Sequence, residues 1–196
     1  MSQPNAVTEN EVFFKHWLRS PKSMGSIIPS SMHLAKALAG EVVWEPGAHV
    51  IELGGGTGAI TQGLLERGIP AANLVVIELE SNLYNYLAGR YPDVTVVQGD
   101  ATRLDEIIAR LPIERVSAVI SGLPMVNMPH DFKRAIIDQA FAAMPAGRAM
   151  LQYTYSPLAP VPVKELNLEA ELVRYVLRNF PPAAVWRYRR KAGAQA

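Results

Sequence analysis

Short apolar runs recur along the chain from residue 48 onward, and amphipathic stretches of helical length separate them. Continuous apolar strands are typical of a parallel sheet that helices cover on both faces, because neither face then meets water. Right-handed crossovers join strands of this kind. We therefore predict a doubly wound, mostly parallel α/β sheet. Its expected strands are residues 48–53, 73–79, 94–98, 116–121 and 149–155, and its expected helices are residues 57–67, 81–90, 102–110 and 132–144.

The end of the chain departs from this alternation. Residues 172–178 and 183–190 are strand-like, and Asn179-Phe180-Pro181-Pro182 between them has the composition of a turn. An antiparallel hairpin would close the sheet, which then has seven strands. We expect the proline-rich residues 156–165 to form the crossing loop that precedes the hairpin.

Helices are also expected ahead of the sheet. Residues 11–24 have the pattern of a basic amphipathic helix, and a second helix runs from a cap at Ser30 or Ser31 to about Val43. A turn over residues 44–47 then leads into the first strand. We therefore divide the chain into an N-terminal helical extension, residues 1–44, and a sheet domain, residues 45–196.

Composition limits the partners and the chemistry. With 196 residues, of which 49% are hydrophobic and 19% charged, the chain is long enough for one well-buried domain. The formal net charge of +1 gives no overall field that would mark a nucleic-acid binder. The absence of cysteine excludes disulfides and thiolate metal sites, and His16, His33 and His49 show no metal-ligand spacing, so we expect no metal. No apolar run reaches about 18 residues and no signal-peptide pattern opens the chain, so we expect neither a membrane span nor secretion.

A glycine-rich turn joins the first strand to the helix after it, in the run Glu52-Leu53-Gly54-Gly55-Gly56-Thr57-Gly58. Such a turn lets backbone approach a ligand that side chains would exclude. A dinucleotide or P-loop site is the alternative, but the Gly-Lys-Ser/Thr ending is absent and an acid before the glycines would repel a pyrophosphate. An acidic side chain suits a cation, and the methionine part of S-adenosylmethionine (SAM) carries an ammonium and a sulfonium.

Acidic residues also follow the next strands. Glu78 ends the second strand, where a carboxylate can accept hydrogen bonds from both ribose hydroxyls. Gly99-Asp100-Ala101 ends the third strand, where the carboxylate can receive the adenine amine and the small residues leave room for the ring. Either acid alone is more often a helix cap. Three features in order at the carboxyl ends of successive strands indicate a SAM site.

This order of features resembles class I methyltransferases, over about residues 45–190. The resemblance implies a Rossmann-like fold and a methyltransferase domain over residues 45–196. It also implies the residues that hold SAM: Glu52, Gly54, Gly56 and Gly58 at the methionine end, Glu78 at the ribose, and Asp100, with Gly99 and Ala101, at the adenine.

The fourth strand ends in Ser121-Gly122-Leu123-Pro124, where this family places the loop that binds the methyl acceptor. In adenine-N6 methyltransferases the loop is Asn-Pro-Pro-aromatic or Asn-Leu-Pro-aromatic, and the aromatic ring stacks on the base. Here serine replaces the asparagine and Met125 replaces the aromatic residue. The parts that read a base are therefore missing.

Longer strings resemble the bacterial phospholipid N-methyltransferases, which are related to the ribosomal RNA adenine dimethyltransferases. The strings are residues 14–18, 25–31, 121–129 and 181–188. The resemblance implies successive methylation of phosphatidylethanolamine to phosphatidylcholine, with S-adenosylhomocysteine as the other product. It implies a cytoplasmic enzyme that lies peripherally on the inner face of the cytoplasmic membrane, with no nucleic-acid partner.

The predicted helix over residues 11–24 suits a membrane surface. Anionic lipid would attract each of its cations with about 1 kcal/mol near the surface, and its aromatic residues suit the interface. The alternative is a helix that packs on the domain. The aromatic residues are Phe13, Phe14 and Trp17, and the cations are Lys15, Arg19 and Lys22.

Methyl transfer to an amine requires a positioned, neutral nucleophile, so the ammonium must first lose its proton. His130, after the acceptor loop, is a candidate base, although a loop histidine is more often exposed to solvent. The rings of Tyr153 and Tyr155 are candidates for holding the methylated cation; the alternative is that they are half-buried strand aromatics. Arg187, Arg189, Arg190 and Lys191 would bind lipid phosphate or form a solvated strand end.

Two other functions stay open. An RNA or small-amine methyltransferase of the same fold is disfavoured by the near-neutral charge and by the missing aromatic residue. A protein that binds SAM and docks on membranes without transferring a methyl group is disfavoured by the intact cofactor residues, although these say nothing of the acceptor chemistry.

Overall fold

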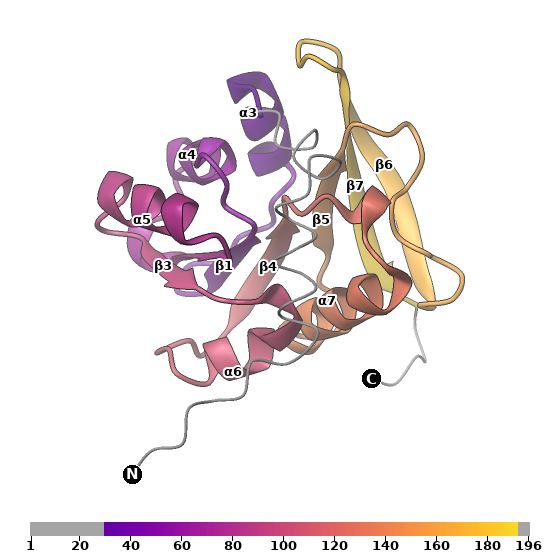
Figure 1. Ribbon diagram of the computed structural model, residues 1–196. Coiled ribbons are helices and arrows are strands. Elements are labelled where there is room, and N and C mark those ends of the chain that lie inside the picture. Colours follow the sequence, from indigo (N-terminus) through magenta and orange to yellow (C-terminus); the bar gives the residue numbers. More distant parts are fainter. Residues whose placement is uncertain (1–29, 192–196) are drawn as a thin grey trace.

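The fold is built on one mixed sheet. The structure is a computed structural model that describes residues 30–191 (Figure 1). The strands lie in the order β3-β2-β1-β4-β5-β7-β6; the first five are parallel, and β7 runs antiparallel to both β5 and β6. The predicted seven-stranded sheet with a closing hairpin is confirmed. The strands are β1 (His49–Leu53), β2 (Leu74–Glu78), β3 (Thr95–Gln98), β4 (Val116–Ser121), β5 (Met150–Thr154), β6 (Leu168–Val176) and β7 (Ala183–Arg190).

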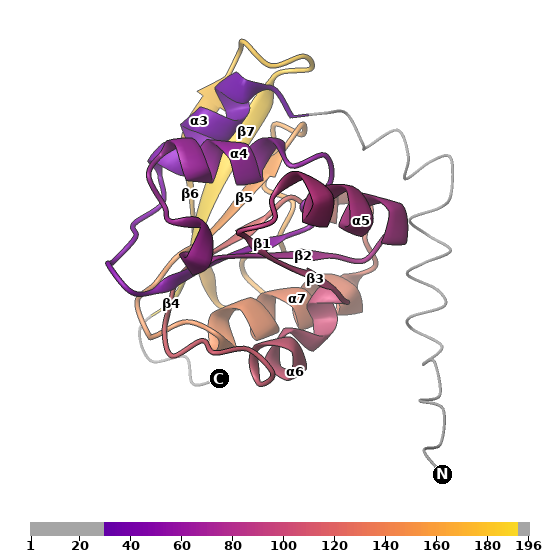
Figure 2. The ribbon, with the colours of Figure 1, turned by 90° about the vertical axis from the view of Figure 1, so that its left-hand side faces the viewer.

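Helices cover both faces of this sheet, as Figure 2 shows. One face packs against α3, α4 and α5, and the other against α6 and α7. Short 3-10 turns η1 (Ala71–Asn73), η2 (Ala101–Arg103) and η3 (Met125–Asn127) lie in the connections. The helices are α3 (Met32–Gly40), α4 (Ala59–Glu66), α5 (Ser81–Arg90), α6 (Leu104–Ile108) and α7 (His130–Ala142).

Successive side chains of the central strands enter opposite cores. In β1, Val50 packs in the core that holds Leu38 and Leu64, whereas Ile51 packs on the other face with Ile137. Side chains of a strand alternate between its two faces. Because both faces are buried, the strand shows an unbroken apolar run in the sequence.

Most elements differ from the predicted boundaries by a few residues, and two of these differences have a clear structural cause. Strand β6 begins at Leu168, earlier than the expected residue 172, because Glu169 and Glu171 point to solvent on this edge strand and break up the apolar pattern. Helix α4 begins at Ala59 and not at Thr57, since Gly58 is its N-cap with φ +80°.

Helix α3 contributes to the core of the sheet. Ser31 caps it by accepting a hydrogen bond from the backbone N–H of Leu34 at 3.2 Å. Leu34 and Leu38 are fully buried against α4. The proposed division of the chain at residue 45 stays a prediction. The amphipathic helix predicted over residues 11–24 lies outside the described residues, and no helix within the described residues combines the length and apolar composition that crossing a bilayer requires.

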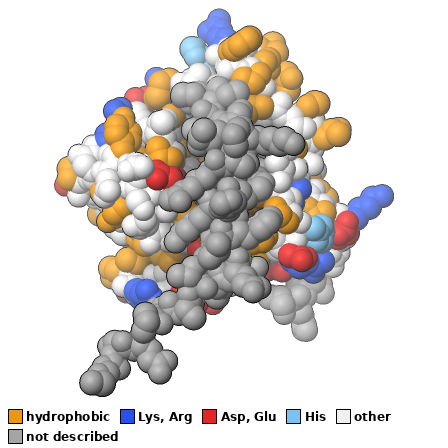
Figure 3. All heavy atoms as spheres, viewed as in Figure 1, with side chains coloured by type: hydrophobic (Ala, Val, Ile, Leu, Met, Phe, Trp, Pro, Cys, Tyr) orange, Lys and Arg blue, Asp and Glu red, His pale blue; other side chains and the backbone are white. Residues whose placement is uncertain are grey.

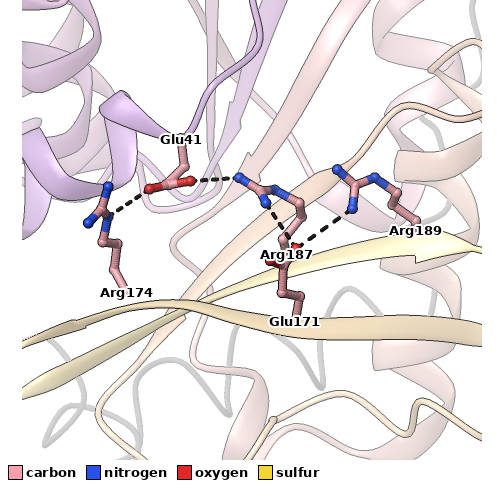
Figure 4. Close-up of polar contacts among 5 residues, drawn as sticks. All are labelled: Glu41, Glu171, Arg174, Arg187 and Arg189. Carbon is pink, nitrogen blue, oxygen red and sulfur yellow. Dashed lines mark hydrogen bonds and ion pairs between the residues drawn. The ribbon is translucent and has the colours of Figure 1, made fainter.

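Ion pairs tie the segment after α3 to the closing hairpin (Figure 4). Glu41 accepts hydrogen bonds from Arg174 at 2.7 Å and from Arg187 at 2.6 Å. Arg187 also donates to Glu171 at 2.9 Å, and Arg189 lies 3.8 Å from the same carboxylate.

Whether the arginines of β7 bind lipid phosphate or form a solvated strand end stays a prediction; these pairs occupy part of their hydrogen-bonding capacity. Arg190 is likewise paired, with Asp138 at 2.5 Å. Since β7 is antiparallel to β5, the arginines lie toward the edge where the parallel strands begin, away from their carboxyl ends. Their charge stabilises the hairpin.

Substitution of Gly63 tests the packing of α3 on α4. A Cβ atom at Gly63 would lie 2.9 Å from the backbone carbonyl of Ala35, whereas one at Gly89 in α5 would meet nothing within 4 Å. We expect Gly63→Ala to lower the free energy of unfolding by about 1–3 kcal/mol because the helices must move apart. Gly89→Ala, the matched control, should raise it by about 0.5–1 kcal/mol. Urea unfolding followed by circular dichroism measures both, and stabilisation by both variants would contradict this packing.

Candidate functional site

The predicted site residues meet where the parallel strands end. Each loop that follows a strand is bonded to the end of its neighbour: Gly54 N–H donates to Ile77 O at 2.8 Å, Gly99 N–H to Glu78 O at 3.1 Å, and Gly122 N–H to Leu53 O at 2.8 Å. The glycine turn, Glu78, the segment around Asp100 and the acceptor loop therefore form one continuous edge.

The glycine turn adopts the left-handed conformations that its residues favour. Gly54, Gly56 and Gly58 have φ values of +77°, +54° and +80°, which side chains other than glycine rarely tolerate. A Cβ atom at Gly54 would also lie 2.7 Å from a methyl carbon of Leu123. Glycine at this position therefore lets the turn lie directly against the acceptor loop.

Glu52 presents an unsatisfied oxygen beside this turn. Its side chain is buried; Oε2 accepts a hydrogen bond from the Thr61 hydroxyl at 2.7 Å, while Oε1 has no partner among the described residues. Burial raises the pKa of Glu52 to about 8, against the lowering effect of the Thr61 bond and with a further rise from nearby Glu78. A buried carboxyl oxygen without a donor fits the ammonium of the SAM methionine group.

Glu78 braces the turn and faces the same edge. Its Oε2 accepts a hydrogen bond from Gly56 N–H at 2.9 Å, and its Oε1 accepts one from Glu80 N–H at 3.0 Å. Burial raises its pKa, and these backbone bonds oppose the rise. Each carboxylate oxygen can accept a second bond, so Glu78 can still receive the two hydroxyls of a ribose.

Asp100 caps η2. Its Oδ1 accepts hydrogen bonds from the backbone N–H and from the hydroxyl of Thr102, both at 2.8 Å. Both bonds use one oxygen, which leaves Oδ2 for an adenine amine. A Cβ atom at Gly99 would lie 2.7 Å from Ile107, and Ala101 is buried in the core. The small size of Gly99 therefore makes room for the side chain of Ile107. That Gly99 and Ala101 also leave space for the adenine ring stays a prediction.

The acceptor loop is held by side chains from two strands. The buried Ser121 hydroxyl accepts a hydrogen bond from Leu123 N–H at 3.3 Å. The amide of Gln152 donates to Leu123 O at 3.0 Å and to Tyr153 O at 2.7 Å.

The sequence analysis did not identify Gln152 and Thr61 as site residues. Each is a polar residue in an otherwise apolar strand or helix face, and a polar side chain inside a core needs a hydrogen-bond partner. That pattern could have indicated both residues.

Aromatic rings complete this part of the edge. The rings of Tyr153 and Tyr155 lie with their centroids 6.0 Å apart in an edge-to-face arrangement. A Cβ atom at Gly122 would lie 3.5 Å from the Tyr153 hydroxyl. Burial raises the pKa of Tyr153 to about 12, so its phenol stays protonated at neutral pH.

His130 does not join the cluster. It is the first residue of α7, is partly exposed, and its Nε2 lies 2.6 Å from a carboxylate oxygen of Glu165. Within the described residues its ion pairs are with Glu165 and Asp131, and neither of these residues belongs to the acceptor loop. In residues 30–191, no three His, Asp or Glu side chains come close enough together to hold a metal ion.

Comparison with known proteins agrees with this geometry. A family model described as ribosomal RNA adenine dimethylase matches residues 7–155. An ornithine lipid N-methyltransferase from Singulisphaera acidiphila is 28% identical over 177 residues, which are 89% of this chain and 90% of the relative. A ribosomal RNA small subunit methyltransferase A from Prosthecochloris aestuarii is 26% identical over 125 residues, which are 63% of this chain. The aligned part is 46% of that relative, so the chain spans less than half of its length.

The fold is also shared with a solved methyltransferase. Magnesium protoporphyrin IX methyltransferase from Synechocystis PCC 6803, solved with bound SAM, aligns with a TM-score of 0.63 at 11% identity. The alignment covers 96% of this chain and all of that one. The matching family model, the shared fold and the edge built around Glu52 lead to the same conclusion: the chain belongs to the ribosomal RNA adenine dimethylase family and is a methyltransferase that uses SAM.

Proposed function

We propose that the chain methylates the amine of a membrane lipid, phosphatidylethanolamine and its methylated intermediates, to give phosphatidylcholine. The observation that favours a lipid amine is the acceptor loop, in which Met125 is buried in the core. An adenine-N6 methyltransferase has an aromatic residue at this position to stack on the base. A relative named for an N-methylated lipid supports the proposal, because it aligns over nearly its whole length.

Methylation of an RNA adenine is the second candidate. The matching family model and the ribosomal RNA methyltransferase relatives favour it. Against it, Ser121 stands where the base-reading asparagine is found, and the net charge of +1 provides little attraction for RNA.

In the proposed mechanism SAM is held by three acidic residues and by the small residues beside them. The acidic residues are Glu52, Glu78 and Asp100, and the small residues are Gly54, Gly56, Gly58, Gly99 and Ala101. Bound SAM supplies an electrophilic methyl group. The Ser121 hydroxyl accepts one hydrogen bond, from Leu123 N–H, so its second lone pair can accept a hydrogen bond from a neutral amine and help to aim the amine lone pair. Gly122 and Pro124 shape this loop.

Protons and methylated products need their own sites. Tyr153 is a poor base, because its phenol stays protonated. We assign the faces of Tyr153 and Tyr155 to the methylated cation, which no longer donates enough hydrogen bonds to be held otherwise. His130 stays a predicted proton acceptor.

The proposal also places the protein on a membrane. Residues 1–44 would act as membrane contact and lid, with residues 11–24 on the anionic surface, and residues 45–196 would form the methyltransferase domain. The protein would lie peripherally on the inner face of the cytoplasmic membrane.

A labelling assay separates the acceptors. The full chain is incubated with SAM labelled in its methyl group and with phosphatidylethanolamine vesicles, ornithine lipid vesicles or ribosomal RNA, each alone. We expect label in phosphatidylethanolamine and in its mono-, di- and trimethylated forms. Label in RNA alone would reject a lipid substrate. Label in ornithine lipid alone would reject phosphatidylethanolamine as the substrate.

Glu52 makes stability and SAM binding depend on pH in opposite directions. Without ligand, Glu52 in the folded chain keeps a proton that it has lost in the unfolded chain between pH 4.5 and about 8. Stability should therefore fall as the pH rises through this range, by at most about 1.4 kcal/mol per pH unit. Affinity for cationic SAM should rise over the same range, because binding must release the Glu52 proton.

Glu52→Gln is the test of this linkage. The variant cannot ionise, so both pH slopes should flatten and SAM should bind more weakly at pH 8. Urea unfolding and titration calorimetry from pH 5 to 9 measure the two slopes. Slopes that persist in the variant would assign them to another group.

Gln152 is proposed to position the acceptor loop. Gln152→Leu removes the donor to Leu123 O and should lower kcat by about 10–100-fold, since small displacements at the reacting atoms have effects of this size. The affinity for SAM should stay within about twofold of wild type, because the hydrogen bonds of Gln152 within the described residues are to Leu123 O and Tyr153 O and not to the glycine turn. Gln139→Leu in α7 is the matched control and should leave kcat unchanged. A loss of SAM affinity in step with kcat would indicate a merely structural role.

A further inference from the structure

Large apolar side chains are exposed on the turn between β6 and β7. Leu177 is 73% exposed and Phe180 is 92% exposed. In the view of Figure 3, hydrophobic side chains gather around the tip of this hairpin, which projects beyond the rest of the fold at the top of Figure 1. Apolar groups of this size in water usually mark a surface that binds something.

The turn is held in this shape by a buried side chain. Asn179, between the two exposed residues, is buried; its oxygen accepts a hydrogen bond from Ser31 N–H at 2.9 Å. Its amide donates to Pro181 O at 2.7 Å. Because Asn179 is anchored inward at the start of α3, Leu177 and Phe180 are presented outward by ordered backbone.

The turn lies on the same edge as the acceptor loop. The register pairs Val176 with Ala183, and Thr154 at the end of β5 with Ala184. Other exposed apolar residues follow the parallel strands on this edge: Val126 in η3, directly after the acceptor loop, and Leu158, after β5. Together Val126, Leu158, Leu177 and Phe180 form what we term the apolar rim.

The charge around the rim favours an anionic surface. Residues 172–182 contain no acidic residue, and Arg178 is exposed between Leu177 and Phe180. The other arginine of this segment, Arg174, is paired with Glu41. Lys133 lies beside Val126, to whose carbonyl it donates a hydrogen bond at 3.4 Å. Apolar side chains flanked by cations are the composition of a segment that sits at the interface of an anionic bilayer.

We infer that the apolar rim is a membrane-docking surface, in which Leu177 and Phe180 enter the headgroup region of an anionic bilayer and hold the acceptor edge against the lipid. The inference rests on the proposed lipid substrate. It adds a contact separate from residues 11–24, built into the sheet itself, and so fixes which edge of the domain faces the membrane.

Vesicle binding tests the rim without turnover. Vesicles of phosphatidylglycerol and phosphatidylcholine contain no amine to methylate, so co-sedimentation with them reports docking alone. We expect the double variant Leu177→Ser/Phe180→Ser to bind at least about tenfold more weakly than wild type. Arg178→Ala should weaken binding about fivefold, and only when phosphatidylglycerol is present.

Val43→Ser is the matched control. Val43 is 65% exposed and lines a pocket with Ser117 and Ala149 at the opposite edge of the sheet, so its removal should leave vesicle binding unchanged. Thermal unfolding and SAM affinity of all variants should match wild type, because none of these side chains is buried or among the residues assigned to SAM.

The outcomes separate docking from catalysis. Suppose that wild type binds vesicles, that the double variant does not, and that phosphatidylethanolamine is not methylated. This result would support the docking surface and reject the proposed substrate. Equal binding by the double variant and wild type would overturn the docking surface even if phosphatidylethanolamine is methylated. A dimer in light scattering that the double variant splits, with vesicle binding unchanged, would assign the rim to a second copy of the chain and also overturn the inference.

Discussion

A single backbone hydrogen bond, from Gly122 N–H to Leu53 O, joins the acceptor loop to the glycine turn. It is possible because β1 and β4 are neighbours in the sheet although distant in the sequence. Glycine is needed on both sides of the contact, since a Cβ atom at Gly122 would lie 2.8 Å from Gly54 O. The distance between the glycine turn and the loop after β4 is thus determined by the spacing of adjacent parallel strands.

The cofactor edge is assembled at a cost to stability. Glu52 is buried with one oxygen that has no partner within residues 30–191, and Glu78 lies near enough to raise its pKa further. Buried carboxyl groups with too few donors destabilise a fold that has no ligand. Residues that satisfy their hydrogen bonds only in the presence of a cationic ligand are typical of a binding site, because evolution can keep them only for their function.

Most of the sheet and the cofactor edge could be predicted from the sequence, because buried parallel strands are unbroken apolar runs and their ends carry the polar residues. Glu52, Glu78 and Asp100 follow this rule. The start of β6 could not be predicted, since Glu169 and Glu171 lie on an exposed edge strand. The roles of Gln152 and Arg187 depend on partners distant in the sequence, Leu123 and Glu41, which only the folded chain brings near.

The position of β7 has a consequence for the order in which the chain folds. This strand, the last of the sequence, lies between β5 and β6 and is the neighbour through which β6 joins the sheet. During synthesis the N-terminal strands emerge first, so β1 to β5 can associate while β6 still has no partner. The ion pairs of Arg187 and the presentation of Phe180 can therefore form only after residues 183–190 have left the ribosome, and the seven-stranded sheet is completed only then.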